Sequence, residues 1–323
     1  MKLPRRKFLH LAAGAAALPT VSRFAWAQAY PTRPVRLIEG FGAGSAPDIL
    51  ARLIGQSLSE QLGQSFVIEN RSGAAGNIAT EAVVRAAPDG YTLLLVTASN
   101  AINATLYDKL GFNFIRDIAP VASICRVPLV MEHPSVPTKT VAEFIAYAKA
   151  NPGKINMASA GTGSIPHMAG EMFKMMTGLD LFHVPYRGAQ VFPALLAGDA
   201  QIYFGPLLSS IEYIRAGKLR ALAVTTTTRS DALPEVPALS DTVPDYEASA
   251  WYGIAAPRNT PAELIKRLNK EVNISIADPK FEARLANLAG TVLSGSAADF
   301  GKLISDETNK WGKVIVAANI KSN

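Results

Sequence analysis

The chain has 323 residues, long enough for two domains with sizeable hydrophobic cores, and its 49% hydrophobic and 18% charged residues are typical of a globular protein. The formal charge of +6 comes from residues 1–29, which hold five basic side chains and no acidic one, so 27 basic residues face 26 acidic ones in the rest. A nearly neutral chain without a basic, aromatic-interleaved patch argues against a nucleic-acid-binding protein.

The N-terminus has the features of an export signal. Pro4–His10 contains an arginine pair like that of twin-arginine leaders, and Leu11–Leu18 is an apolar core too short for a stable membrane anchor. Small-x-small cleavage sites end at Ala27 and at Ala29, and we favour Ala27. We expect residues 1–27 to direct export to the periplasm by the twin-arginine or general secretory route; the alternative is an N-terminal membrane anchor.

The chain contains one cysteine, Cys125. It therefore has no lipobox cysteine in the leader and can form no intrachain disulfide, so packing must stabilise the fold. We interpret Cys125 as a small buried apolar residue.

The first half alternates apolar runs with amphipathic helices, which predicts a parallel sheet with right-handed crossovers. The expected strands cover 33–41, 65–69 and 91–97, and the expected helices cover 46–62 and 76–87. Residues 118–132 are predicted to form one or two strands that cross into a second lobe.

A glycine-rich turn joins the first strand to the first helix. Gly42 and Gly44 permit backbone angles that other residues avoid. Ser45 is a good N-cap, and Asp48 follows three residues later, like the acid of a capping box. The amides and the positive end of such a helix form an anion site that needs no basic side chain.

A second βα series repeats this pattern. Its expected strands are 155–158, 181–185, 201–205 and 219–225, and its expected helices are 140–150, 165–177, 192–196 and 211–216. Ser159–Ser164 is a second glycine-rich turn before a helix. Residues 229–249 are predicted to return irregularly to the first lobe, where we expect a strand over 250–256 and helices starting at Thr260 (a capping box), Asp278 and Ser296.

Several stretches together resemble a known family. They are Asn70–Asn77, Pro88–Leu93, His183–Gly188, Ile211–Val224 and Trp251–Pro257. With the leader and the first turn, they are similar to the Bug family of periplasmic substrate-binding receptors of tripartite tricarboxylate transporters, over about residues 30–320.

The resemblance implies an α/β, two-lobed periplasmic-binding-protein fold of type II-like form. Each lobe would be a mostly parallel sheet flanked by helices, with the ligand in the cleft between them. Lobe one would be 30–130 plus 250–323, and lobe two 131–249. The partners would be a small carboxylate and integral membrane transporter subunits, and the receptor would be a monomer with no cofactor and no metal.

The resemblance also places ligand-binding residues at the two turns and beside the cleft. The first turn supplies Phe41, Ala43, Gly44, Ser45, Ala46 and Asp48, and the second supplies Ser159, Ala160, Gly161, Thr162, Gly163, Ser164 and His167. Ser99, Asn100, Tyr186, Arg187 and Phe204 are expected at loop positions facing the cleft. The family turn usually has Pro-Gly-Gly where this chain has Ala43–Ser45, and Gln190–Ala194 also departs from the family pattern, so the identity of the ligand does not transfer.

Other site classes fit less well. The spacing of Gly40, Gly42 and Gly44 does not complete a dinucleotide fingerprint, and no Walker A sequence is present. His167 and Glu171 could share a helix face as metal ligands, but they lack an evident third ligand. Ser164 and His167 do not build a hydrolase triad, and no nucleophile elbow is present.

Four residues keep two interpretations. Asp48 either braces its own turn, which we favour, or binds a cationic ligand group. Arg187 either binds a distal carboxylate or forms a salt bridge. We interpret Trp251 and Tyr252 as core residues beside a hinge strand; the alternative is that they contact an aromatic ligand.

The sequence therefore predicts a periplasmic receptor, not an enzyme. Its ligand would be a di- or tricarboxylate, an acidic amino acid or an aromatic acid, with a dicarboxylate favoured because each turn could hold one end. The alternatives are an exported α/β enzyme acting on a small organic acid and a ligand sensor that feeds a signalling system.

Overall fold

The computed structural model describes residues 30–107, 109–134 and 136–322. The predicted signal peptide lies outside these residues. Of the described residues, 30–32 belong to a separate unit, and those from Arg33 onward form one compact unit. No helix in the described ranges is both long and apolar enough to cross a membrane.

The compact unit begins with a parallel βα series. Strand β1 (Val35–Glu39) pairs in parallel with β2 (Phe66–Asn70) and with β3 (Thr92–Thr97). Helix α2 (Ala46–Leu62) connects β1 to β2, and η1 (Ala74–Gly76) with α3 (Asn77–Val84) connects β2 to β3. The helical spacing of Leu50, Ile54 and Leu58 buries one face of α2.

A second parallel series is built in the same way. Strand β5 (Asn156–Ser159) pairs in parallel with β6 (Phe182–Pro185) and β7 (Ile202–Pro206). The helices of this series are α6 (Val141–Ala150), α7 (Ile165–Thr177), α8 (Val191–Ala197) and α9 (Leu207–Arg215), with η2 (Gly188–Gln190) before α8 and strand β8 (Arg220–Val224) after α9.

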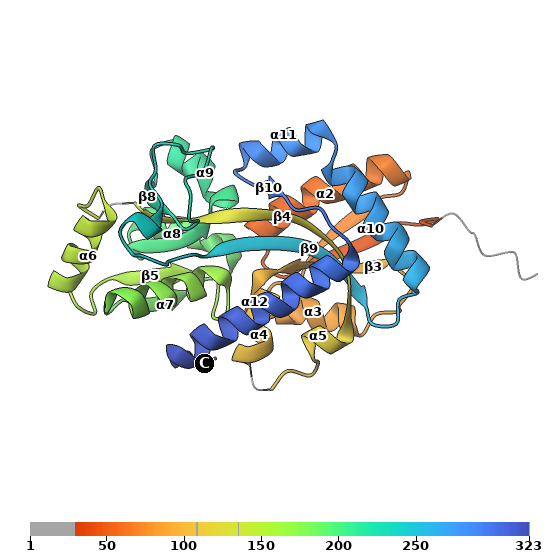
Figure 1. Ribbon diagram of the computed structural model, residues 1–323, viewed down its shortest axis with the longest axis horizontal. Coiled ribbons are helices and arrows are strands. Elements are labelled where there is room, and N and C mark those ends of the chain that lie inside the picture. Colours follow the sequence, from red (N-terminus) through yellow and green to blue (C-terminus); the bar gives the residue numbers. More distant parts are fainter. Residues whose placement is uncertain (1–29, 108, 135, 323) are drawn as a thin grey trace, which may run out of the picture. The chain divides into compact units, whose positions relative to one another are not determined.

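Two long antiparallel strands join the series, and Figure 1 shows them running side by side across the sheet. Strand β4 (Ile118–His133) pairs with β9 (Ser249–Pro257) as far as Pro128 and with β7 and β8 from Leu129 onward. The strand order is β2-β1-β3-β9-β4-β7-β5-β6, with β8 and β10 (Thr291–Val292) paired to β4. The strand prediction for residues 118–132 is confirmed: they form one continuous strand that pairs with members of both series.

The C-terminal helices return to the first series. They are α10 (Ala262–Ile276), α11 (Pro279–Asn287) and α12 (Ala297–Ala317), and 3-10 helix η3 (Leu239–Asp241) lies in the irregular segment before β9. Helix α12 packs against α4 (Ala98–Leu106) and also reaches α7, so it bridges the two series (Figure 1). Trp251 and Trp311 are completely buried and belong to the core, as does Cys125, whose thiol pKa is raised by burial.

Most expected elements are confirmed to within a few residues, and α2 and α7 match their predicted bounds. Helices α4 and α5 (Phe114–Asp117) and strand β10 were not predicted. The capping box expected at Thr260 is wrong. The Thr260 hydroxyl donates to the Pro257 carbonyl 2.7 Å away, and Pro261 occupies the N-cap position without a side-chain cap.

Candidate functional site

The first turn, Phe41–Ser45, leads from β1 into α2. Gly42 and Gly44 have φ angles of 85° and 78°, in the left-handed region that favours glycine. The Ser45 hydroxyl donates to the Gly42 carbonyl (2.7 Å) and accepts from the Asp48 amide (3.4 Å). These contacts close the turn and cap the helix.

Two carboxylates of the protein brace this turn from behind. Glu39 accepts hydrogen bonds from the amides of Phe41 (2.7 Å) and Gly42 (2.8 Å), and Asp48 accepts one from Gly44 (3.0 Å). Burial raises the pKa of Glu39. Burial also acts to raise the pKa of Asp48, but hydrogen bonds from Arg52, Asn70 and Gly44 outweigh it, and the net shift is downward. The interpretation of Asp48 as a brace is confirmed.

This bracing reduces the number of amides that could bind an anion at the first turn. The amides of Phe41, Gly42 and Gly44 already donate to protein carboxylates, and that of Ser45 donates to the Gly42 carbonyl. Within the described part of the chain, Ala43 and Ala46 have backbone amides without a hydrogen-bond partner. A ligand at this turn can therefore use few of the amides that the sequence suggested.

The second turn, Ser159–Ser164, leads from β5 into α7 and is braced by neutral groups. The Gly161 amide donates to the Ser159 hydroxyl (3.1 Å), and the Gly163 amide donates to Nδ1 of His167 (3.2 Å). The Ser164 hydroxyl caps α7 by accepting from the His167 amide. Among the residues described, the amides of Ala160 and Thr162 have no partner.

A stacked histidine pair supports this turn. The rings of His167 and His183 lie 3.9 Å apart, and the Ser159 hydroxyl is 2.7 Å from Nε2 of His183. Burial lowers the pKa of His167 to about 3 and that of His183 to about 4. The positive charge of Lys174 lowers both pKa values further, and repulsion from His183 also lowers that of His167. Both rings are therefore neutral at pH 7, so His167 Nδ1 and His183 Nε2 can act as hydrogen-bond acceptors.

We expect this histidine pair to make the stability of the fold sensitive to acid. The unfolded state binds protons near pH 6.5, whereas the folded imidazoles stay neutral to about pH 4 and 3. The free energy of unfolding should therefore fall as pH drops from 6.5 toward 4, by up to about 1.4 kcal/mol per pH unit for each histidine. Urea unfolding of His167→Asn/His183→Gln, which keeps an acceptor near each bonding nitrogen, should show a shallower loss. An identical pH dependence in the variant would contradict this cause.

The metal interpretation of His167 and Glu171 gains no support. His167 Nε2 is 3.9 Å from the Glu171 carboxylate, which accepts instead from Lys174 at 2.9 Å. Across the described ranges, no group of three or more potential metal-ligating side chains is placed to hold an ion.

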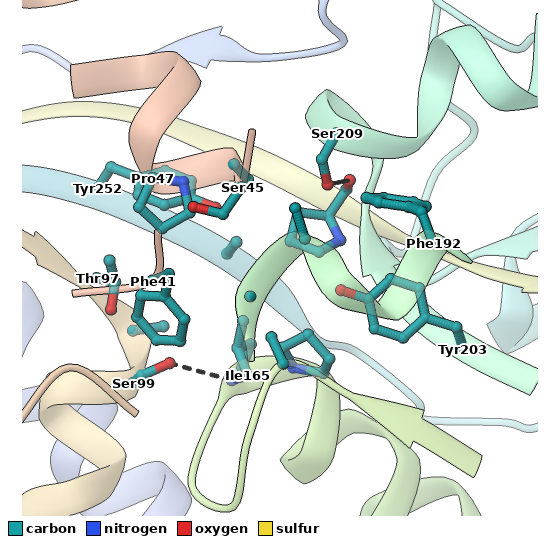
Figure 2. Close-up of a pocket in the computed structure, with 18 residues that line it drawn as sticks. Phe41, Ser45, Pro47, Thr97, Ser99, Ile165, Phe192, Tyr203, Ser209 and Tyr252 are labelled. Atoms are coloured by element: carbon teal, nitrogen blue, oxygen red, sulfur yellow. Dashed lines mark hydrogen bonds between the residues drawn. The ribbon is translucent and has the colours of Figure 1, made fainter. Parts of the chain in front are cut away.

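A small pocket lies between the two turns (Figure 2). Of the predicted residues, those that line it are Phe41, Ser45, Ala46, Ser99 and Ala160. The other side chains around it include Pro47, Ile165, Phe192, Tyr203, Ser209 and Tyr252. The enclosed volume is about 30 Å³, on the scale of a water molecule, so a larger ligand can enter only if the walls move apart.

A second, larger hollow of about 390 Å³ shares Phe41, Ala160 and Gly188 with the first. Gly161, Tyr186 and Arg187 line it, together with residues 72–75. Arg187 has no ion-pair partner in the part of the chain that the structure describes, so the structure gives no support to its salt-bridge interpretation.

The remaining predicted residues lie behind or beside these pockets. Those that line neither are Ala43, Gly44, Asp48, Asn100, Ser159, Thr162, Gly163, Ser164, His167 and Phe204. Ser99 and Asn100 were expected in a loop, but they lie in the first turn of α4. Asn100 completes a capping box there with Thr97. Phe204 is not in a loop either. It lies within β7, completely buried, with its ring 5.3 Å from that of Phe173.

Direct contacts hold the second turn against α4. The Ile165 amide donates to the Ser99 hydroxyl at 3.2 Å, drawn as a dashed line in Figure 2, and the Tyr107 hydroxyl donates to the Thr162 carbonyl at 3.0 Å. A Cβ atom at Gly163 would lie 2.2 Å from Asn103 Oδ1, which shows how closely these segments approach. The pocket is thus closed by contacts between the two βα series.

Comparison with known proteins identifies the family. Residues 50–320 match the model of the tripartite tricarboxylate transporter family receptor. The chain belongs to this family. It is 33% identical over 296 residues to BugT of Bordetella pertussis, which covers 90% of each chain. The predicted relationship to Bug receptors is therefore confirmed.

Solved structures agree with the fold. An R. palustris protein with adipate has a TM-score of 0.88 and 36% identity, covering 90% of this chain and 99% of that one. The periplasmic binding protein BugD has a TM-score of 0.87 and 30% identity, covering 91% and 100%. MatC from Rhodopseudomonas palustris, with bound malate, has a TM-score of 0.85 and 28% identity, covering 88% and 100%.

These relationships confirm the α/β periplasmic-binding-protein fold predicted from the sequence. The protein is a periplasmic carboxylate-binding receptor that works with membrane transporter subunits, and it is not an enzyme. The two turns and the pocket between them are its candidate ligand site.

Proposed function

We propose that the receptor holds a ligand carboxylate between its two turns, on the amides of Ala46 and Ala160. The observation that carries this proposal is that both residues line one pocket and that neither amide has a partner among the described residues. Ala46 is the first residue of α2, so the helix dipole favours negative charge there. A hydrogen bond to a charged group contributes about 1.5–3 kcal/mol.

The rest of the ligand would lie against apolar side chains. Phe41, Ile165 and Phe192 line the pocket, and no Lys, Arg or His does. The adipate bound by one structural relative has an apolar middle of this kind. A small acid with an apolar body therefore suits the pocket better than a densely charged tricarboxylate.

Binding requires the pocket to open and close. We propose that 30–130 with 250–323 and 131–249 act as the two lobes, because β4 changes partners from β9 to β7 and β8 at Pro128–Val130. Hinge closure around a ligand is the usual motion of such receptors. We further propose that the receptor is a monomer, exported by the twin-arginine or general secretory route with cleavage near Ala27.

A thermal-shift screen of small acids tests this function. A true ligand at 100 times its Kd should raise the free energy of unfolding by about 2.7 kcal/mol, because it binds only the folded state. The screen should include mono-, di- and tricarboxylates, acidic amino acids and aromatic acids at pH 7. If none of these acids raises the Tm, the carboxylate proposal is wrong.

A further inference from the structure

Two tyrosine hydroxyls face the pocket without a partner. Tyr203 on β7 and Tyr252 on β9 are only 3% and 2% exposed, and both line the pocket. Within the described residues, neither hydroxyl makes a hydrogen bond. Neither is among the fully enclosed, unpartnered polar atoms, in contrast to the indole nitrogen of Trp251. The hydroxyls therefore open onto the small free space of the pocket.

Packing fixes the position of the Tyr203 ring. The ring of Phe192 meets it edge-on, with centroids 6.1 Å apart, and Figure 2 shows the Tyr203 hydroxyl pointing into the space between the pocket walls. Burial raises the pKa of Tyr203 and of Tyr252. Both phenols therefore remain protonated at neutral pH, and each offers an O–H donor.

The lining of the pocket offers these hydroxyls no positively charged partner. None of the residues that line the pocket is ionised at pH 7. Behind Tyr203, a Cβ atom at Gly205 would lie 2.2 Å from Tyr203 Cε1 and 2.8 Å from Glu132 Oε1, so the buried Glu132 carboxyl is beside the ring. Its Oε1 accepts from the Ser210 hydroxyl at 2.5 Å, and its Oε2 has no partner in the described structure.

We propose that Tyr203 and Tyr252 determine specificity by donating hydrogen bonds to an oxygen atom at the far end of the ligand. This inference rests on the function proposed above, with the first carboxylate held by Ala46 and Ala160. The ligand class is a carboxylic acid with an apolar chain or ring and a second oxygen function. A pocket built to bond such an oxygen discriminates against an analogue that lacks it, because buried donors are then left unpaired.

A series of acids of equal chain length tests the assignment. Hexanoate, 6-hydroxyhexanoate and adipate, with their four- and eight-carbon counterparts, are titrated by calorimetry into the wild type, Tyr203→Phe, Tyr252→Phe and the double variant. In the wild type we expect an ω-oxygenated acid to bind about 5- to 100-fold more tightly than the plain acid. Tyr203→Phe should remove most of that advantage and leave the affinity for the plain acid unchanged, because the ring is retained.

Tyr147→Phe is the matched control, since Tyr147 lies on α6 and lines neither pocket of the site. An advantage of the oxygenated acids that survives in the double variant overturns the assignment. The assignment is also overturned if adipate still binds more tightly than hexanoate in Tyr203→Phe but not in Arg187→Gln. The second carboxylate would then lie in the larger hollow. If no acid in the series binds the wild type, the carboxylate function itself fails, which is a separate result.

Discussion

Gly188→Ala is expected to weaken ligand binding more than any other single-methyl change near the site. Gly188 has a φ angle of +52°, and a Cβ atom there would lie 1.8 Å from the Phe41 carbonyl oxygen and 2.9 Å from its carbon. Both are backbone atoms of the first turn, so the closed pocket cannot form without a shift. Overpacking of this kind costs about 1–3 kcal/mol, which raises the apparent Kd about 5- to 150-fold.

The measurement is calorimetric titration with the best acid from the screen, together with X-ray scattering to follow closure. Gly217→Ala is the matched control, because Gly217 has a similar φ of +67° but nothing within 4 Å of the added methyl group. Both variants carry the strain of a left-handed alanine, and only Gly188→Ala carries the collision. Wild-type affinity in Gly188→Ala would show that binding does not use this closed arrangement.

Ala46→Pro is expected to lower affinity about 10- to 150-fold, since it removes one charge-assisted donor worth about 1.5–3 kcal/mol. Proline is well tolerated at the first position of a helix, and Ser45 already has the extended backbone that precedes proline (φ −74°, ψ 161°). The substitution therefore removes the amide proton with little effect on α2. The readouts are the Kd from calorimetry and the unliganded Tm.

Helix α12 provides the control for this substitution. Its N-cap Ser296 has nearly the same backbone angles as Ser45 (φ −76°, ψ 165°) and likewise precedes alanine, with an aspartate three residues after the cap. Ala297→Pro should leave both Kd and Tm near their wild-type values. If Ala46→Pro binds as tightly as Ala297→Pro does, the Ala46 amide does not hold the carboxylate.

The backbone amides of the two turns divide into braced donors and free donors. Glu39 and Asp48 occupy the amides of the first turn, while neutral Ser159 and His167 occupy those of the second. The amides at Ala46 and Ala160 are left free by this bracing. The carboxylates set the shape of the first turn, and the ligand can use only the donors that they do not take.

Local patterns in the sequence were sufficient for the helices that carry the site. Helices α2 and α7 each begin with serine, a small or apolar residue and proline, and each ends at a left-handed glycine, Gly63 or Gly178. Caps, periodicity and terminators act within a few residues, so one segment determines both ends of the helix. Helix α4 was missed because its first turn, Ala98–Asn100, follows the strand directly and contains residues common in loops.

The residues that line the pocket could not be predicted from local patterns, because contacts between distant segments bring them together. Tyr203 and Tyr252 are 49 positions apart and meet the same pocket only because β7 and β9 both flank β4. The hydrogen bonds of Glu39 to the first turn and of His183 to the second were not predicted, because each depends on a side-chain orientation that is set by packing. The loop position predicted for Phe204 was wrong because the residue belongs to strand β7, where its side chain is buried in the core.

The amino-acid sequence was sufficient to predict the two βα series, the two glycine-rich turns before helices, the receptor family and the nearly neutral charge outside the first 29 residues. Those features depend on residue type and spacing along the chain. The packing of the chain in space was needed to show which amides remain free, that His167 braces its turn, and that Tyr203 and Tyr252 open onto the pocket. Hydrogen-bond donors are free or occupied according to what lies opposite them in space, and that is set by how the strands and helices pack.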